Sequence, residues 1–108
     1  SIIIDVKNHI GKIIFEGDNH NSLNINLLEK LVLSLKSLDK NPTVRVIILC
    51  SKGERSFSAG ADLKELLQLE NKEKSLRFFS SFAILFNTIR SVKKIVIGRI
   101  QGKSIGGV

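Results

Sequence analysis

The sequence predicts an α/β domain whose later strands run parallel. Runs rich in β-branched residues alternate with stretches in which leucine and phenylalanine recur at helical spacing. The resulting order of strand, helix, strand, helices and strand is typical of sheets whose strands are joined by right-handed crossovers. The 108 residues suit a single domain, and the sequence contains no repeat, low-complexity tract or linker that would divide it.

The start of the chain predicts a β-hairpin. Residues 2–6 and 12–16 are β-branched or aromatic runs, which are typical of strands. The segment between them contains Asn8 and Gly11, and both residue types favour a turn.

A helix and a buried strand are predicted next. Asn24 is a suitable N-cap for a leucine-rich helix that we expect to end near Asp39. Pro42 opposes continuation of that helix. Residues 44–50 form a nearly continuous apolar run, which is typical of a strand covered on both faces.

The second half of the chain predicts two helices and a further strand. Asp62 and Glu65 have the spacing of a capping box, so a short helix is expected to begin at Asp62. A longer helix with a phenylalanine-rich core stripe is predicted over 72–92. Residues 94–100 are predicted to form the last strand.

The composition is that of an ordinary globular protein, with 43% hydrophobic and 25% charged residues. We expect a cytoplasmic chain with no membrane partner, because it has neither a long uninterrupted apolar stretch nor a secretion signal at its start. Cys50 ends an apolar run and is predicted to be a buried structural thiol. His9 and His20 lack further ligands at metal-binding spacing, so no metal site is predicted.

The net charge of +7 raises the question of an anionic partner. No acidic residue follows Glu73, but the basic residues beyond it are scattered and lack interleaved aromatic residues for base stacking. We therefore expect no nucleic-acid partner. A solvated basic surface and attraction of a small phosphate-bearing ligand both fit this charge.

Two glycine-containing segments follow predicted strands, namely "SKGERSFSAGADLKEL" and "IQGKSIGGV". In open α/β sheets, ligands bind beyond the carboxyl ends of the strands, where loops expose backbone donors. A tight turn without a ligand is one alternative for the second segment, and a phosphate-binding P-loop is another. The P-loop spacing fails by one residue, because Ile97 stands where that motif requires glycine.

Both segments, in this order, resemble the enoyl-CoA hydratase/isomerase family, the crotonases. The matching stretches are "VRVIILCSKGERSFSAGADL", "IVIGRIQGKSIGG" and the helix opening "SLNINLLEKL", so the resemblance spans nearly the whole chain. It implies a crotonase-like spiral of ββα turns, of which residues 1–108 would be the N-terminal portion of a single domain, ending after the second oxyanion-hole glycine. It also implies that the backbone amides of Ala61 and Gly107 form an oxyanion hole for a thioester oxygen.

The activity that the resemblance implies is that of an acyl-CoA-processing enzyme that stabilises a thioester enolate, most simply by adding water across a 2-enoyl double bond. Isomerase, hydrolase and decarboxylase chemistry, or a non-catalytic acyl-CoA-binding or assembly module, remain as alternatives. Coenzyme A would be part of the substrate, with no separate cofactor. The resemblance also implies a homotrimer or hexamer. The family's catalytic glutamates would follow Val108, so we expect the fragment alone to be inactive.

Further site residues follow from the same resemblance. They are expected to line the acyl-CoA channel: Ser22, Leu23, Ser58, Ala59, Gly60, Ala61, Asp62, Leu63, Gly106 and Gly107. Asp62 is interpreted as a helix cap rather than a catalytic acid or base.

Four basic residues are candidates for contacts with the CoA phosphates or, alternatively, for solvated surface charges: Lys12, Lys52, Arg55 and Lys64. The chain departs from the family pattern at Ser58, Ile95 and Val108, which leaves its subgroup open.

Overall fold

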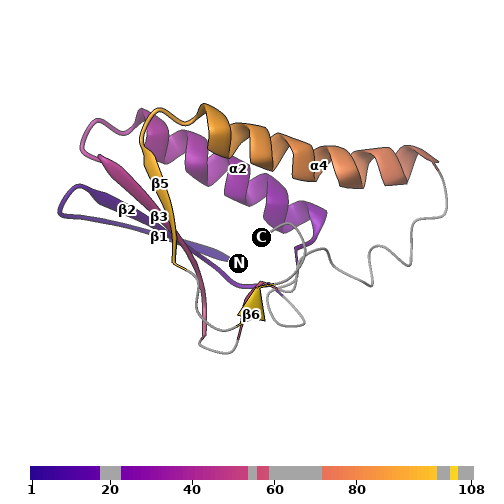
Figure 1. The fold of residues 1–108 in the computed structure, drawn as a ribbon, viewed down its shortest axis with the longest axis horizontal. Helices are drawn as coiled ribbons and strands as arrows, with labels where there is room; N and C mark the ends of the chain where they lie inside the picture. Colours follow the sequence, from indigo (N-terminus) through magenta and orange to yellow (C-terminus); the bar gives the residue numbers. More distant parts are fainter. Residues whose placement is uncertain (18–22, 54–55, 59–71, 100–102, 105–108) are drawn as a thin grey trace.

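The structure is a computed structural model of the chain, and it describes residues 1–17, 23–53, 56–58, 72–99 and 103–104. Two helices lie side by side on one side of a four-stranded sheet (Figure 1). The elements in chain order are β1 (Ile2–Lys7), β2 (Ile10–Phe15), α2 (Ile25–Lys40), β3 (Val46–Ser51), β4 (Ser56–Ser58), α4 (Lys72–Ser91), β5 (Ile95–Arg99) and β6 (Lys103–Ser104).

The four-stranded sheet has the order β1-β2-β3-β5. Strands β1 and β2 pair antiparallel, while β2 with β3 and β3 with β5 pair in parallel. A second, two-stranded sheet is formed by β4 and β6, which are also parallel. This arrangement confirms the α/β class and the parallel later strands.

The predicted hairpin is confirmed, but its turn differs from the prediction. Asn8 and His9 form the turn, with positive φ angles of 52° and 65°, as two-residue hairpin turns of type I′ require. Gly11 lies inside β2 instead. The His9 carbonyl accepts the amide of Arg45 at 2.8 Å, and a ring nitrogen of His9 lies 2.9 Å from the Thr43 carbonyl. The turn is therefore held by the segment that leads into β3.

Helix α2 begins where the sequence predicts. The side chain of Asn24 accepts the backbone amide of Leu27 at 2.8 Å, which confirms it as the N-cap. At the other end, the Lys94 ammonium group donates to the Leu38 carbonyl at 2.7 Å and also to the Asn41 carbonyl. A cation at the negative end of the helix dipole is favourable, so Lys94 ties the start of β5 to the end of α2.

The remaining described elements match the prediction with shifted ends. The helix predicted over 72–92 is α4, and the strands predicted over 44–50 and 94–100 are β3 and β5. The short helix predicted to begin at Asp62 lies outside the described residues.

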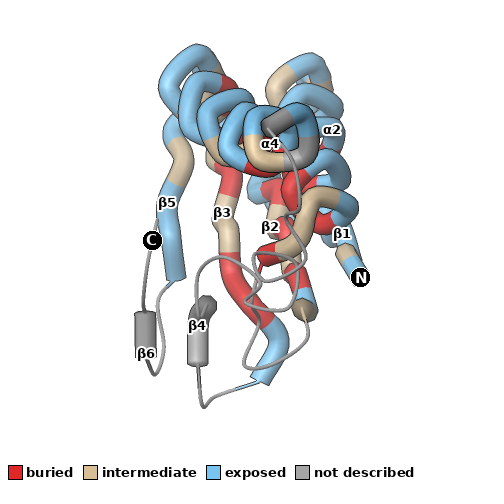
Figure 2. The backbone as a smooth tube through the Cα atoms, turned by 90° about the vertical axis from the view of Figure 1, so that its right-hand side faces the viewer, coloured by how far each residue is buried: buried red, intermediate tan, exposed pale blue. Residues whose placement is uncertain are grey.

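The hydrophobic core lies between α2, α4 and one face of the four-stranded sheet (Figure 2). Successive residues of a strand point to opposite faces, and Ile13, Phe15 and Ile47 point to the helices and are buried. Helix α2 supplies most of the other side of this core: Leu27, Leu28, Leu31, Val32, Leu35 and Leu38. Phe78 and Leu85 of α4 are also buried.

The opposite face of the sheet is largely open within the described part of the chain. Ile95 and Ile97 on β5 keep 65% and 49% of their surface exposed, while Val46 and Ile48 on β3 are half-buried. The predicted cover on both faces of β3 is therefore observed only on the helix-facing side. Cys50 is the exception on the open face, because its thiol is buried 3.6 Å from the Ile13 carbonyl. This confirms it as a buried thiol.

Candidate functional site

The parallel strands bring the two glycine-containing segments to one edge of the sheet. Their register aligns Phe15 with Ser51, and Cys50 with Arg99, so β2, β3 and β5 end together. Strands β4 and β6 follow β3 and β5 in the chain and lie at this edge (Figure 2). The carboxyl-end location expected from the sequence is therefore observed for the parts of both segments that the structure describes.

The two segments also pair directly with each other. Strands β4 and β6 run parallel, with Ser56 opposite Lys103 and Ser58 opposite Ser104. One residue, Phe57, separates the paired positions on β4, whereas the paired positions on β6 are consecutive, so the register shifts at Phe57.

Of the predicted channel residues, the structure describes two. Ser58 ends β4, in the pair that joins the two segments. Leu23 is only 5% exposed and belongs to the hydrophobic core cluster. The others lie outside the described residues: Ser22, Ala59, Gly60, Ala61, Asp62, Leu63, Gly106 and Gly107. The oxyanion hole thus remains a prediction.

The P-loop alternative does not fit the observed backbone. In that motif the lysine and the following serine or threonine stand at the opening of a helix that cradles phosphates. Here Lys103 and Ser104 form strand β6 and pair with β4. This segment is therefore part of a ladder rather than the start of a phosphate-binding helix.

The candidate phosphate-binding cations differ in position. Lys52 lies at the carboxyl edge, 3.9 Å from the Glu16 carboxylate, and both side chains are more than half exposed. An ion pair this solvated is weak. Lys12 instead lies in the middle of β2, opposite Ile48. Arg55 and Lys64 lie outside the described residues.

A small polar cavity of about 170 Å³ lies at the same edge, between the end of β2 and the start of α2. It was not predicted, because its lining joins residues that are separated in the sequence: Ser1, Glu16, Gly17, Asn24, Asn26, Leu27 and Lys30. Its lining offers hydrogen-bonding groups beside the site, but Asn24 already accepts the Leu27 amide.

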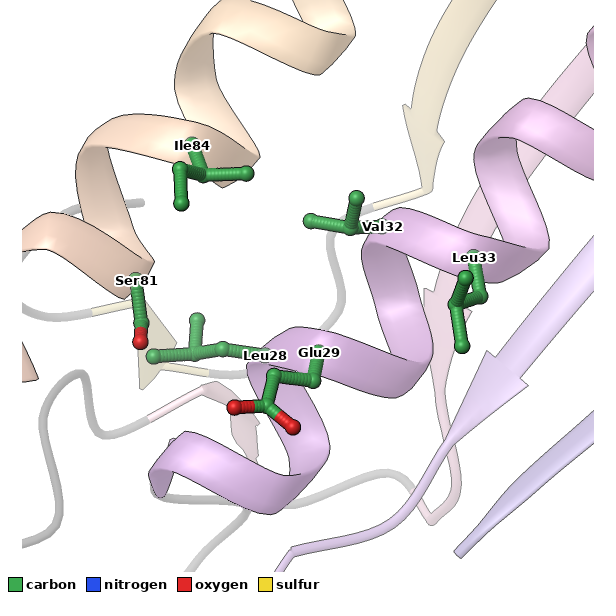
Figure 3. A pocket seen from close by; sticks show the side chains of 6 residues that line it. All are labelled: Leu28, Glu29, Val32, Leu33, Ser81 and Ile84. Carbon is green, nitrogen blue, oxygen red and sulfur yellow. The ribbon is translucent and has the colours of Figure 1, made fainter. Parts of the chain in front are cut away.

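A larger groove of about 290 Å³ lies between α2 and α4 (Figure 3). Leu28 and Val32 of α2 face Ser81 and Ile84 of α4 across it. The Ser81 hydroxyl donates to the Arg77 carbonyl of its own helix at 2.9 Å. The lining of this groove is mainly apolar, with Glu29 and Ser81 as its polar members, and the groove lies between the helices rather than at the strand ends.

Neither a metal centre nor a membrane span is observed in the described ranges. Within them, no three histidine, cysteine, aspartate or glutamate side chains come together as metal ligands. Neither α2 nor α4 is long and apolar enough to cross a membrane.

Comparison with known proteins places the chain in a family. The model of the enoyl-CoA hydratase/isomerase family matches residues 5–108. The YngF protein of Bacillus subtilis (strain 168), provisionally named an enoyl-CoA hydratase/isomerase, is 32% identical over 111 residues, which is 99% of this chain and 42% of YngF. The mitochondrial 3-hydroxyisobutyryl-CoA hydrolase of Bos taurus is 33% identical over 81% of this chain and 23% of its own length.

A solved structure supports the same assignment. The crystal structure of an enoyl-CoA hydratase from Bacillus anthracis superposes with a TM-score of 0.86 at 32% identity, and the match covers 94% of this chain and 40% of that one. The described architecture is thus the crotonase fold. The chain belongs to the enoyl-CoA hydratase/isomerase family, and it spans less than half the length of each of these three relatives.

Proposed function

We propose that the chain supplies the thioester-binding part of an acyl-CoA enzyme, in which the backbone amides of Ala61 and Gly107 hold the thioester oxygen. Family membership supports the substrate class, because relatives carry the names of acyl-CoA hydratases and an acyl-CoA hydrolase. The observation that carries the proposal is the parallel pairing of Ser58 with Ser104. Each proposed donor follows its paired serine by three residues, and three residues span at most about 10 Å.

The proposed reaction is hydration of a 2-enoyl-CoA. Water loses a proton and its oxygen bonds to C3 of the substrate, while the double-bond electrons move toward the thioester and place negative charge on its oxygen. Two backbone N–H groups aimed at that oxygen stabilise the enolate, which then takes a proton at C2. Loss of one such donor typically lowers the rate by ~10² to 10³. No residue of the chain is assigned as the acid or base.

The small residues beside the donors fit this role. Gly60 precedes Ala61 and Gly106 precedes Gly107, and a backbone without a bulky side chain allows the close approach that donation to a ligand oxygen requires. The cytoplasmic location, the absence of a separate cofactor and the homotrimeric or hexameric assembly stay predictions from the family resemblance.

The decisive experiment replaces one amide donor in the whole protein. We expect Gly107→Pro, which removes the N–H group, to lower turnover of a 2-enoyl-CoA by ~10² or more while the protein stays folded. Gly107→Ala keeps the N–H group and is expected to lose much less. Product formation over time measures the turnover of both variants, and circular dichroism serves as the control for folding. Unchanged turnover in a folded Gly107→Pro variant would remove Gly107 from the mechanism.

A further inference from the structure

The groove between α2 and α4 has a buried apolar floor and exposed apolar margins (Figure 3). Leu28 and Val32 form the floor, since they are only 0% and 8% exposed. Leu33 of α2 and Ile84 of α4 line the same groove but keep 66% and 52% of their surface exposed within the described part of the chain. Exposed apolar side chains that gather around a hollow are typical of surfaces that bind another molecule.

The two ends of this groove differ in charge. At the end where both helices begin, the Arg77 guanidinium lies 3.4 Å from the Glu29 carboxylate and joins α4 to α2. Toward the other end, Lys36 and Lys40 follow Leu33 at spacings of three and seven residues, so they continue its face of α2. Neither lysine takes part in an ion pair observed in the described ranges.

Further cations gather where both helices end. Arg90, Lys93 and Lys94 lie in the last turn of α4 and directly after it. Asp39 supplies the one carboxylate of residues 34–41 and 88–99, and it already accepts the Lys93 amide at 3.1 Å. This end of the helix layer is therefore basic, in a chain whose net charge is +7. An acidic partner would be attracted to it.

A helix suits this groove better than a strand or a bilayer. Adding a strand requires the open edge of a sheet, whereas both walls here are helices whose backbone groups are bonded within each helix. A bilayer is flat on this scale and does not enter a groove. An amphipathic helix satisfies its own backbone and lays apolar side chains at spacings of three and four residues into such a groove.

We propose that the groove between α2 and α4 binds an acidic amphipathic helix of a partner protein. Apolar side chains of that helix pack against Leu33 and Ile84, and its carboxylates lie toward Lys36 and Lys40. This inference goes beyond the proposed function and does not depend on it, because the groove lies between the helices rather than at the strand ends.

A synthetic peptide tests the groove in the whole protein. The probe is a fluorescein-labelled helical peptide with leucines at spacings of three and four along one face and glutamates beside them. The control peptide has lysine in place of each glutamate. Fluorescence anisotropy measures the binding of both, and we expect the acidic peptide to bind at least ~10 times more tightly. Sodium chloride should weaken that binding, because salt screens exposed charges.

Matched variants test whether the apolar part of the groove is used. Leu33→Ser removes an exposed apolar side chain from the groove and should weaken binding of the acidic peptide about tenfold. Phe79→Ser is the control, since Phe79 is 59% exposed and lies two residues from Ser81, on another side of α4. It should change affinity by less than about twofold. Circular dichroism checks that both variants are folded, and Ile84→Ser replaces Leu33→Ser if that variant does not fold.

A second pair of variants tests the charge. Lys36→Glu reverses a charge beside the groove and should weaken binding of the acidic peptide about fivefold. Lys7→Glu makes the same change in net charge at an exposed position on β1, outside the groove. It should therefore have a clearly smaller effect.

Several results would overturn the proposal. They are a whole protein that does not bind the acidic peptide, a groove variant that binds it as tightly as the parent, and equal effects of Lys36→Glu and Lys7→Glu. Vesicles containing phosphatidylserine test the membrane alternative, and vesicle binding that Leu33→Ser abolishes would assign the groove to a membrane instead. Turnover of a 2-enoyl-CoA is not a readout here, so none of these results bears on the proposed function.

Discussion

The two faces of the four-stranded sheet carry similar residues in different environments. On β2, Ile13 points to the helices and is fully buried, whereas its neighbour Ile14 points to the other face and is half-buried. On β5, Val96 packs against the core cluster, whereas Ile95 and Ile97 are exposed. A β-branched residue therefore does not reveal which side of a sheet is covered. The packing of α2 and α4 decides it.

The largest expected effect on stability comes from comparing the two faces of the sheet on a single strand. Ile13→Ala should lower the free energy of unfolding by about 2 to 5 kcal/mol, because it removes buried methyl groups and leaves a cavity under the helices. Ile14→Ala makes the same chemical change on the neighbouring residue and should cost clearly less, since that side chain is already partly in water. Urea unfolding of both variants measures the difference. Equal losses would contradict the contrast between the faces.

A second experiment increases rather than removes volume on the covered face. A Cβ atom on Gly11 would lie 3.0 Å from both terminal carbons of Leu38 and 3.2 Å from a methyl of Val44. We expect Gly11→Ala to lower the free energy of unfolding by about 1 to 3 kcal/mol through overpacking. Combining it with Leu38→Ala, which frees that space, should cost less than the sum of the two single losses. A strictly additive double variant would show that the crowding carries no penalty.

The helix layer itself can be weakened at its start. Asn24→Ala removes the acceptor for the Leu27 amide and should lower the free energy of unfolding by about 0.5 to 2 kcal/mol. Asn24→Asp keeps a side-chain oxygen in place and serves as the control. Thermal unfolding followed by circular dichroism compares the three proteins. An alanine variant as stable as the aspartate variant would show that the cap contributes nothing.

The smallest effect is expected on the open face. Ile97→Thr keeps a β-branched side chain at a position that is 49% exposed, so the free energy of unfolding of the 108-residue chain should change by no more than about 0.5 kcal/mol. Val96→Thr, on the helix-facing side of the same strand, should cost more because it buries a hydroxyl group. A larger loss at Ile97 than at Val96 would reverse the assignment of the faces.

The sequence by itself determined the order and kind of the described elements. Asn24 marked the start of α2, the spacing of apolar residues marked both helices, and the β-branched runs marked the strands, because these signals depend on neighbouring residues. The family motifs also pointed to the two segments beyond the strand ends. Local reasoning placed Asn8 correctly in the hairpin turn but wrongly assigned Gly11 to it, since His9 takes a positive φ angle that the segment preceding β3 helps to hold.

Only the tertiary structure decided what distant residues do together. It selected the covered face of the sheet, placed Lys12 in the middle of β2 rather than at the carboxyl edge, and paired Ser58 with Ser104 next to a register shift. These features join residues tens of positions apart in the chain. They arise from strand register and helix packing, which minimise exposed apolar surface over the whole molecule and leave no trace in any short stretch of sequence.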